Sequence, residues 1–312
     1  MSELEIRQIS SGEAKKADLI MKTAFGTFIG LKEPERFAGD SSYVSSRWSI
    51  DKNRVFGAFL EGELIGSNVA TLWGTFGFFG PLSIHPDYWG RGFAGELMEP
   101  VMDLLTATHV KACGLFTFPD SLKHISMYEK FGFYSSYLTI VLAKSLSDRI
   151  IDKRDQSLKK PPRTVQEDTL TDCRIVSESI FPGLNLKEEL LGAAREGQGS
   201  VLVTETGNSF ALCHSGKGSE AGSKTSYLKF ASVRANQSDA KTEFQLLLDL
   251  CEAEAISRGS TTLVAGVNAG RRDAYRVLRE KGYKPITTGI SMVKPGGHPF
   301  SSPELFIIDD WR

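Results

Sequence analysis

One order of strands and helices occurs twice along this 312-residue chain, and this repeat limits the possible folds more than any other feature. In the first half, Ile84 at the end of an apolar strand precedes Gly132 by 48 positions (132 minus 84). In the second half, Val233 precedes Gly282 by 49 positions (282 minus 233). Landmarks at matched intervals indicate two copies of one supersecondary plan, and the alternative is a chance agreement between two unrelated α/β domains. The sequence therefore predicts an α/β (α+β) fold of two tandem domains, each a mixed central sheet flanked by helices.

The periodicity of apolar residues places the elements of each copy. In the first half it predicts strands at about 6–9, 55–60, 64–72, 76–84, 114–118 and 137–143, with helices at about 13–25, 93–105 and 121–131. In the second half it predicts a hairpin of 200–204 and 209–214, strands at 227–233 and 261–267, and helices at 242–257 and 270–281. A charged stretch that ends in two prolines separates the halves. We therefore expect a first domain at 1–146, a linker at 147–164, a second domain at 165–294 and a tail at 295–312.

The composition excludes several classes of partner. The 37 Lys and Arg residues balance the 38 Asp and Glu residues, so no broad basic field favours nucleic acid or an anionic membrane surface. The apolar runs are much shorter than the ~20 residues that span a bilayer. The first residues lack a basic segment followed by an apolar one, and the four cysteines show no CxxC spacing. We expect a cytoplasmic protein with reduced thiols that binds neither nucleic acid nor membrane.

The most informative stretch is the glycine-rich turn between the strand that ends at Ile84 and the helix that follows it. Gly90, Gly92 and Gly95 allow the backbone to approach a ligand closely before the helix begins. Unpaired N–H groups at a helix start, together with the positive end of the helix dipole, suit a pyrophosphate. Arg91 adds a cation there. The alternative interpretation is a turn that serves helix packing alone.

The same glycines spell GxGxxG, which is also the dinucleotide-binding fingerprint. That interpretation requires the turn directly after the strand and an acidic residue about 20 positions later. Here five residues separate Ile84 from Gly90, and the next predicted strand at 114–118 carries no acid. The interpretation of this chain as a nicotinamide-linked oxidoreductase is therefore supported by the glycine motif alone.

Two motifs in the first half resemble those of the GNAT superfamily of acyl-CoA-dependent N-acetyltransferases. Trp89-Gly90-Arg91-Gly92-Phe93-Ala94 corresponds to the family's glycine turn, and Tyr128-Glu129-Lys130-Phe131-Gly132-Phe133 corresponds to its later Tyr and Gly-Phe motif. The motifs occur in the family order, 37 residues apart (128 minus 91). Trp89 stands where the family usually has Gln or Arg, which weakens one polar contact. The resemblance implies that acetyl-CoA is bound by Leu82, Ser83, Ile84, Trp89, Gly90, Arg91, Gly92, Phe93, Ala94 and Gly95.

The resemblance also implies transfer of the acyl group to an amine of a small molecule or amino acid by direct attack. Tyr128 fits the acid that protonates the departing thiolate, although an aromatic residue at this helix position can also serve packing alone. The base is less clear: His85 and His124 titrate near neutrality, each can also be an ordinary surface histidine, and a chain of waters is a further alternative. The remaining histidines show no metal-ligand spacing, so the sequence predicts no metal site.

The second copy lacks the features that give the first its chemistry. The stretch 236–243 takes the place of the glycine turn, contains no glycine, and puts Asp239 and Glu243 where a phosphate requires neutral donors or cations. Leu278 takes the place of Tyr128. We therefore expect a non-catalytic second domain that supports the first and walls its acceptor pocket. In the tail, Asp309 or Asp310 is a candidate contact for the amine, although a solvated chain end is favoured. The alternative function is an acyl-CoA-binding sensor or scaffold without turnover.

Overall fold

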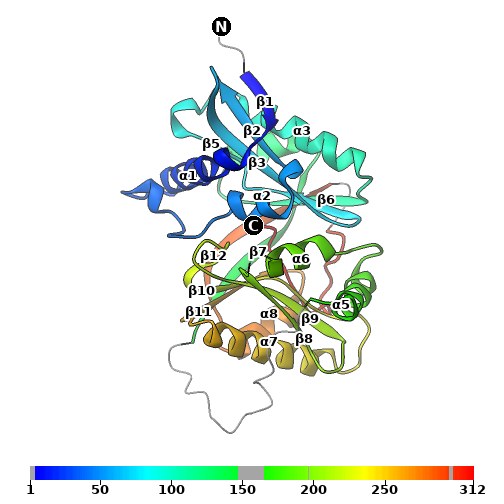
Figure 1. Ribbon diagram of the computed structural model, residues 1–312. Coiled ribbons are helices and arrows are strands. Elements are labelled where there is room, and N and C mark those ends of the chain that lie inside the picture. Colours follow the sequence, from blue (N-terminus) through cyan, green and yellow to red (C-terminus); the bar gives the residue numbers. More distant parts are fainter. Residues whose placement is uncertain (1–3, 147–164, 196, 295–297) are drawn as a thin grey trace.

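The computed structural model describes residues 4–146, 165–195, 197–294 and 298–312 (Figure 1). The N-terminal half forms the upper part of the view, and the C-terminal half forms the lower part. The elements of the N-terminal half are β1 (Leu4–Gln8), α1 (Ser11–Phe28), η1 (Pro34–Arg36), α2 (Val44–Ile50), η2 (Lys52–Arg54), β2 (Val55–Leu60), β3 (Glu63–Trp73), β4 (Phe76–Phe79), β5 (Ser83–Ile84), η3 (Pro86–Tyr88), α3 (Phe93–Ala107), β6 (Ala112–Thr117), α4 (Leu122–Lys130) and β7 (Tyr134–Ser145).

The C-terminal half repeats the strand and helix order of the N-terminal half, with α5 and α6 before its first strands as α1 and α2 stand before β2. Its elements are α5 (Glu167–Ile180), α6 (Lys187–Arg195), β8 (Gly199–Val203), β9 (Ser209–Gly216), β10 (Gly222–Val233), α7 (Ala240–Ser257), β11 (Thr262–Asn268), α8 (Arg272–Glu280), β12 (Lys284–Lys294) and β13 (Ile307–Ile308). The predicted linker at 147–164 lies outside the described residues. The helices α5 and α6 are absent from the sequence prediction, although Leu170, Cys173 and Val176 of α5 follow the helical period.

The two halves share one sheet because they exchange their last strands. In the described part of the chain, the strand order is β1-β2-β3-β4-β6-β12-β7-β11-β10-β9-β8. The C-terminal strand β12 pairs with β6 of the N-terminal half, and β7 of the N-terminal half pairs with β11. The predicted mixed α/β fold is confirmed, with a large mixed sheet flanked by helices. The sheet, however, runs through both halves without interruption.

The two faces of the sheet are covered by different helices. On β3, Val69 packs into a core with residues of α1, whereas the adjacent Ala70 packs into a core with residues of α3 and α4. Side chains alternate between the faces of a strand, so α1 lies on one face and α3 and α4 lie on the other. In the C-terminal half, α7 and α8 cover one face and α5 and α6 cover the other.

The chain end is buried, which corrects the favoured prediction of a solvated tail. Asp309, Asp310 and Trp311 are each at most 3% exposed. The carboxylate of Asp309 lies 2.8 Å from the guanidinium of Arg271, and the hydroxyl of Tyr227 donates to Asp310 at 2.5 Å. These pairs satisfy the two acids inside the protein, so neither is free to meet an amine.

Two further sequence predictions concern cysteines and membrane spans. All four cysteines are buried, and none of them forms a disulfide. Among the helices of the described residues, none is both long enough and apolar enough to cross a bilayer.

Candidate functional site

Two neighbouring strands in the N-terminal half separate and leave a gap between them. The parallel strands β4 and β6 pair at Phe76 and Ala112, and their described pairing ends at Phe78 and Gly114. Beyond this point, β5 pairs with β3, whereas β6 continues beside β12 as far as Thr117. The gap gives an extended ligand access to unpaired main-chain groups of the separating strands.

The glycine turn follows β5 and ends at the start of α3. Gly90 and Gly92 have positive φ angles of 82° and 88°, which side-chain-bearing residues rarely adopt. A Cβ atom at Gly90, Gly92 or Gly95 would meet no other atom within 4 Å, so the turn faces open space. The helix α3 has no side-chain cap at its first turn. Backbone N–H groups at this helix start are therefore available to an anion, and the open turn has room for a diphosphate group.

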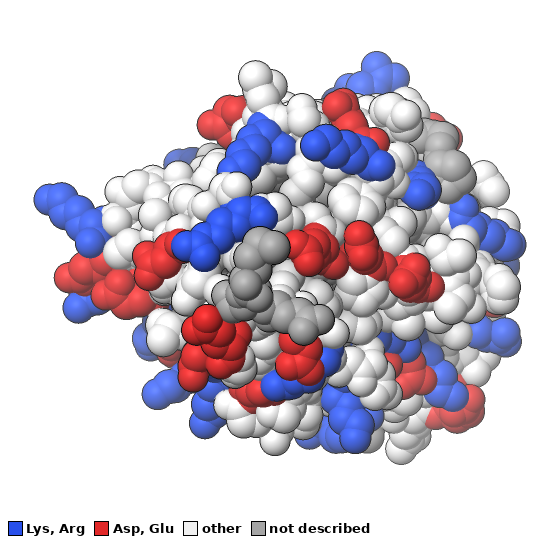
Figure 2. Space-filling view, turned by 90° about the horizontal axis from the view of Figure 1, so that it is seen from above, with Lys and Arg blue, Asp and Glu red and all other residues white. Residues whose placement is uncertain are grey.

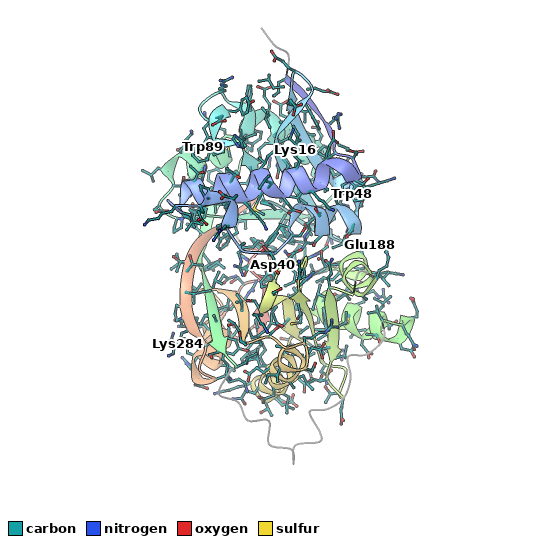
Figure 3. All side chains as sticks on the ribbon, turned by 60° about the vertical axis from the view of Figure 1, so that its left-hand side comes forward. Lys16, Asp40, Trp48, Trp89, Glu188 and Lys284 are labelled. Carbon is teal, nitrogen blue, oxygen red and sulfur yellow. The ribbon has the colours of Figure 1, made fainter. Side chains whose placement is uncertain are left out.

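Trp89 ties this turn to the strand before it. Its indole N–H donates to the carbonyl oxygen of Ile84 at 2.7 Å, while the side chain remains 42% exposed. The sequence interpretation, in which Trp89 only weakens a contact, missed this bond because residue spacing carries no information about it. Figure 3 shows Trp89 on the outer side of the N-terminal half. Arg91 is exposed, and its guanidinium carbon lies 5.3 Å from the ring centre of Tyr88.

The remaining residues of the predicted cofactor site lie between the strand gap and the helix. Ser83 and Ile84 are buried, and Leu82 is half-buried. Phe93 and Ala94 are half-buried and pack against the core that contains Ile84. Gly95 donates its N–H to the carbonyl oxygen of Gly92 at 2.8 Å. The predicted cofactor residues thus form two stretches, 82–84 and 89–95, whose apolar side chains anchor them while Gly90 and Gly92 remain exposed.

Tyr128 lies between the two separating strands. Its ring centre is 5.8 Å from that of Phe79 at the end of β4, and its hydroxyl interacts with Thr117 at the end of β6. Burial raises the pKa of this phenol above its usual range, and the hydrogen bond with Thr117 opposes that rise. The group therefore stays protonated at neutral pH. It can donate a proton on the face of the sheet that carries α3 and α4.

The two candidate bases lie in different surroundings. The His124 ring lies against that of Phe28 of α1 in a tilted arrangement, with ring centres 5.2 Å apart. Burial lowers the pKa of His124, and the charge of the adjacent Lys123 lowers it further. His85 caps η3 instead, where its Nδ1 accepts a long bond of 3.5 Å from the N–H of Asp87. A neutral, half-buried imidazole can accept a proton, and His124 fits that description at neutral pH.

The sequence interpretation missed a group of aromatic residues beside His124. Phe118 follows β6 directly, and its ring centre lies 4.8 Å from that of Phe28 and 6.1 Å from that of Phe25. Phe25 and Phe28 belong to α1 on one face of the sheet, whereas His124 belongs to α4 on the other. The group therefore crosses the sheet next to the strand gap. Its members are far apart in sequence, so no local pattern could have brought them together.

The second half carries no comparable glycine turn at the matching place. The helix α7 begins seven residues after Val233 (240 minus 233), whereas α3 begins nine residues after Ile84 (93 minus 84). The carboxylate of Glu243 does not face a ligand there, because the hydroxyls of Thr206 and Ser209 donate to it at 2.7 and 2.8 Å inside the protein. A shallow cavity of about 390 Å³ lies beside this turn, lined by 233–238, Ala240, Lys241, Asp273, Arg276, Val277 and 304–306.

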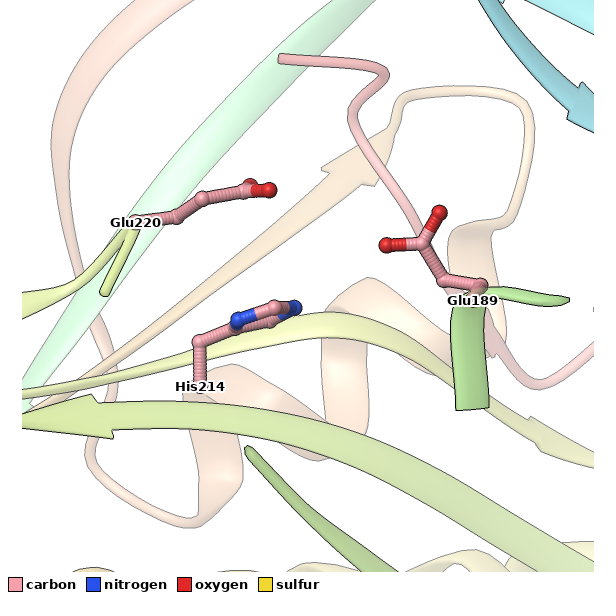
Figure 4. Close-up of side chains that lie close together, drawn as sticks. All are labelled: Glu189, His214 and Glu220. Carbon is pink, nitrogen blue, oxygen red and sulfur yellow. The ribbon is translucent and has the colours of Figure 1, made fainter. Parts of the chain in front are cut away.

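Three buried side chains at the junction of the halves have the arrangement of metal ligands. Oxygen atoms of Glu189 and Glu220 and a ring nitrogen of His214 lie within 4.8 Å of one another (Figure 4). The guanidinium of Arg47, however, bonds to both oxygens of Glu189 at 2.6 and 2.7 Å and also pairs with Glu220. Lys229 pairs with Glu220 at 3.2 Å. Two cations already balance the two carboxylates, so this cluster is an ion-pair network that joins the halves.

Further contacts at the molecular surface join the halves without producing a field of one sign. Asp40, labelled in Figure 3 at the boundary between the halves, accepts from the N–H of Ser223 at 2.7 Å. Basic and acidic side chains are interspersed on the face shown in Figure 2.

Comparisons with known proteins match the N-terminal half to one family. Residues 25–133 match the family model described as Acetyltransferase (GNAT) family. A protein named Acetyltransferase from Yersinia pestis (strain Pestoides F) is 35% identical over 89 residues, which is 28% of this chain and 62% of that protein. A protein of Yersinia pseudotuberculosis, also named as an acetyltransferase, matches to the same extent. The chain thus spans less than two thirds of the length of these relatives.

Solved structures resemble the whole chain in fold. A putative acetyltransferase from Pyrococcus horikoshii has a TM-score of 0.69 at 16% identity, with 99% of this chain and 95% of that chain covered. A tandem GNAT protein from the clavulanic acid biosynthesis pathway has a TM-score of 0.56 at 13% identity, with 94% and 100% covered. At these identities the likeness concerns the fold alone. Residues 25–133 are thus similar to the GNAT acetyltransferase family, and the whole chain has the fold of tandem GNAT proteins.

Proposed function

We propose that this protein is an acetyl-CoA-dependent N-acetyltransferase that acylates an amine of a small molecule or amino acid. The observation that carries the proposal is the pairing of an open glycine turn with a strand gap. Gly90 and Gly92 expose the start of α3, and the gap between β4 and β6 begins in the same half of the chain. The turn suits a diphosphate, and the gap suits the extended arm of a thioester cofactor.

Each part of the predicted segment has a role in binding. Main-chain N–H groups of residues 90–94 bind the pyrophosphate, and Arg91 supplies a positive charge at the surface. Trp89 keeps the turn in place through its bond to the Ile84 carbonyl oxygen. The main chain of 82–84 pairs with the pantetheine arm and presents an N–H group to the developing oxyanion. When bound, acetyl-CoA supplies an activated acyl group.

Tyr128 acts as the acid and His124 as the base. The buried phenol stays protonated between Phe79 and Thr117, from where it donates its proton to the departing thiolate. The phenolate regains a proton from the nitrogen of the new amide. His124 accepts the proton of the ammonium group, because its lowered pKa keeps the imidazole neutral. The free amine then attacks directly while both substrates are bound, so the protein needs only to position them.

A thiol-release assay over a panel of amines, amino acids and peptides tests this function, and calorimetry with acetyl-CoA and NADH accompanies it. We expect acetyl-CoA to bind, NADH not to bind, and at least one amine to accelerate thiol release. Binding of acetyl-CoA without acceleration by any amine contradicts the enzyme and supports an acyl-CoA sensor. If the protein binds NADH and does not bind acetyl-CoA, both the acetyltransferase and the acyl-CoA sensor are contradicted.

A further inference from the structure

The last residues of the chain pack against the N-terminal half at the point where the strand gap begins. Trp311 is 3% exposed, and its ring centre lies 5.0 Å from that of Phe76 on β4. A Cβ atom placed on Gly114 of β6 would come within 2.5 Å of the Trp311 ring, with further ring atoms at 2.8 and 3.2 Å. The indole therefore lies directly on the backbone of β6 at its last described pair with β4.

Trp311 lies on the face of the sheet opposite Tyr128. Along β6, Cys113 and Leu115 pack into the core that contains Tyr128, whereas Ala112 packs into the core that contains Trp311. Gly114 shares the orientation of Ala112, because side chains two residues apart on a strand point the same way. The two aromatic residues thus enclose the beginning of the gap from opposite faces.

Several contacts fix the position of Trp311. The hydroxyl of Tyr227 donates to Asp310, and the ammonium group of Lys229 donates to the carbonyl oxygen of Arg312. The His298 ring stacks on the indole with ring centres 4.4 Å apart. Trp311 has a φ angle of 55°, a conformation that a bulky residue keeps only where its surroundings impose it. The tail is therefore locked in place on both sides of the indole.

We propose that Trp311 is a positioning residue that sets where β4 and β6 separate, and thereby fixes the gap for the thioester arm. This inference rests on the proposed function, since it concerns the same gap. Gly114 allows the indole to reach the backbone of β6, and the indole holds Gly114 paired with Phe78. Without the indole, the last described pair of β4 and β6 loses its support, so the gap widens and binds the arm less well.

Substitutions on both sides of this contact test the proposal in the full-length protein. Trp311→Ala and Gly114→Ala should each lower the affinity for acetyl-CoA about 10-fold, whereas Trp311→Phe should retain most of it. The double variant Gly114→Ala with Trp311→Ala should lose less than the two single losses combined, because the methyl group enters space that the indole has left. If Trp311 served only stability, Trp311→Ala would lower thermal stability, but the affinity losses of the two single variants would not be coupled in the double variant.

Phe306→Ala is the matched control, since Phe306 is also a buried tail residue but packs against Phe244 of the C-terminal half. It should lower thermal stability and leave the acetyl-CoA affinity within about 2-fold. Equal affinity losses in Phe306→Ala and Trp311→Ala, or full additivity in the double variant, would overturn the role of Trp311. If the unmodified protein binds acetyl-CoA but acylates no amine, the proposed function fails while the affinity series still tests Trp311.

Discussion

The turn after β5 and the turn after β10 occupy matching places in the two halves but differ in what they offer a ligand. The first contains Gly90 and Gly92 at positive φ and faces open space. The second turn is two residues shorter. When Val233 is aligned with Ile84, an offset of 149 positions, Lys241 takes the place of Gly92. Both helices that follow, α3 and α7, start without a side-chain cap. A helix start without a side-chain cap is therefore common to both halves, whereas the glycines and the longer turn occur only in the first.

The helices α4 and α8 give a second comparison. Each spans nine residues, and Tyr128 and Leu278 take matching places and are both buried. Packing is satisfied by either side chain, but only the tyrosine brings a hydroxyl group to the strand gap. The comparison shows that the fold tolerates apolar residues where the chemistry requires a polar one.

The largest expected effect is that of Tyr128→Phe. This change should lower turnover roughly 10- to 1000-fold, because the departing thiolate loses its proton donor, and it should leave acetyl-CoA affinity nearly unchanged. Thiol-release kinetics and calorimetry measure the two quantities. The control is Tyr283→Phe, which removes a buried hydroxyl from the C-terminal half and should leave turnover unchanged. Normal turnover in Tyr128→Phe removes this residue from the mechanism.

The comparison of the two turns predicts the next effect. Gly92→Asp should lower the affinity for acetyl-CoA about 100-fold, since it places a negative charge beside the phosphates and forces a side chain into a φ of 88°. Lys241→Asp introduces the same charge at the matching place of the second half and should change the affinity less than 2-fold. If Lys241→Asp weakens binding as much as Gly92→Asp does, the cofactor turn is misassigned.

A smaller effect is expected from the bond that holds the first turn. Trp89→Phe removes the donor to the Ile84 carbonyl oxygen, which costs about 1 kcal/mol and should weaken acetyl-CoA binding about 5-fold. Trp48→Phe is the matched control, because the Trp48 indole donates to the carbonyl oxygen of Ile9 instead. Equal affinities of the two variants in calorimetry would remove Trp89 from the binding site.

The smallest effect concerns stability against pH at the junction of the halves. Burial lowers the pKa of His214 below 6.5, so the unfolded chain takes up this proton first and stability falls as the pH drops below 6.5. Burial alone would raise the pKa of Glu220, but Arg47 and Lys229 outweigh it and hold the pKa at about 2. The stability from Glu220 is therefore present above pH 4.5 and is lost between pH 4.5 and 2.

Urea unfolding at a series of pH values measures this dependence. His214→Leu should flatten the decline just below pH 6.5 and leave the decline below pH 4.5 unchanged. If the free energy of unfolding of His214→Leu falls below pH 6.5 as steeply as that of the unmodified protein, His214 is not the group responsible for that decline. Either outcome leaves the cofactor turn unaffected, because that turn lies outside the ion-pair network.

Local sequence patterns predicted the helices and strands that carry the candidate site. They did not predict contacts between residues far apart in the sequence. The predicted helices at 93–105 and 242–257 agree closely with α3 and α7, because their apolar residues follow the helical period. Two short motifs led to the prediction that the glycine turn and Tyr128 belong to the site. The exchange of β7 and β12 could not be predicted, because the strand sequences do not specify which neighbour each will pair with. The burial of Trp311 depends on Gly114, nearly 200 residues away (311 minus 114 is 197).

Hydrogen exchange of backbone amides, with and without acetyl-CoA, tests the central claim most directly. The claim is that main-chain N–H groups of the first turn bind the phosphates of the cofactor, and that those of the second turn do not. We predict slower exchange at 90–97 when acetyl-CoA is present, and unchanged exchange at 236–243. Slower exchange confined to 236–243, or none at 90–97 at saturating acetyl-CoA, would contradict the account.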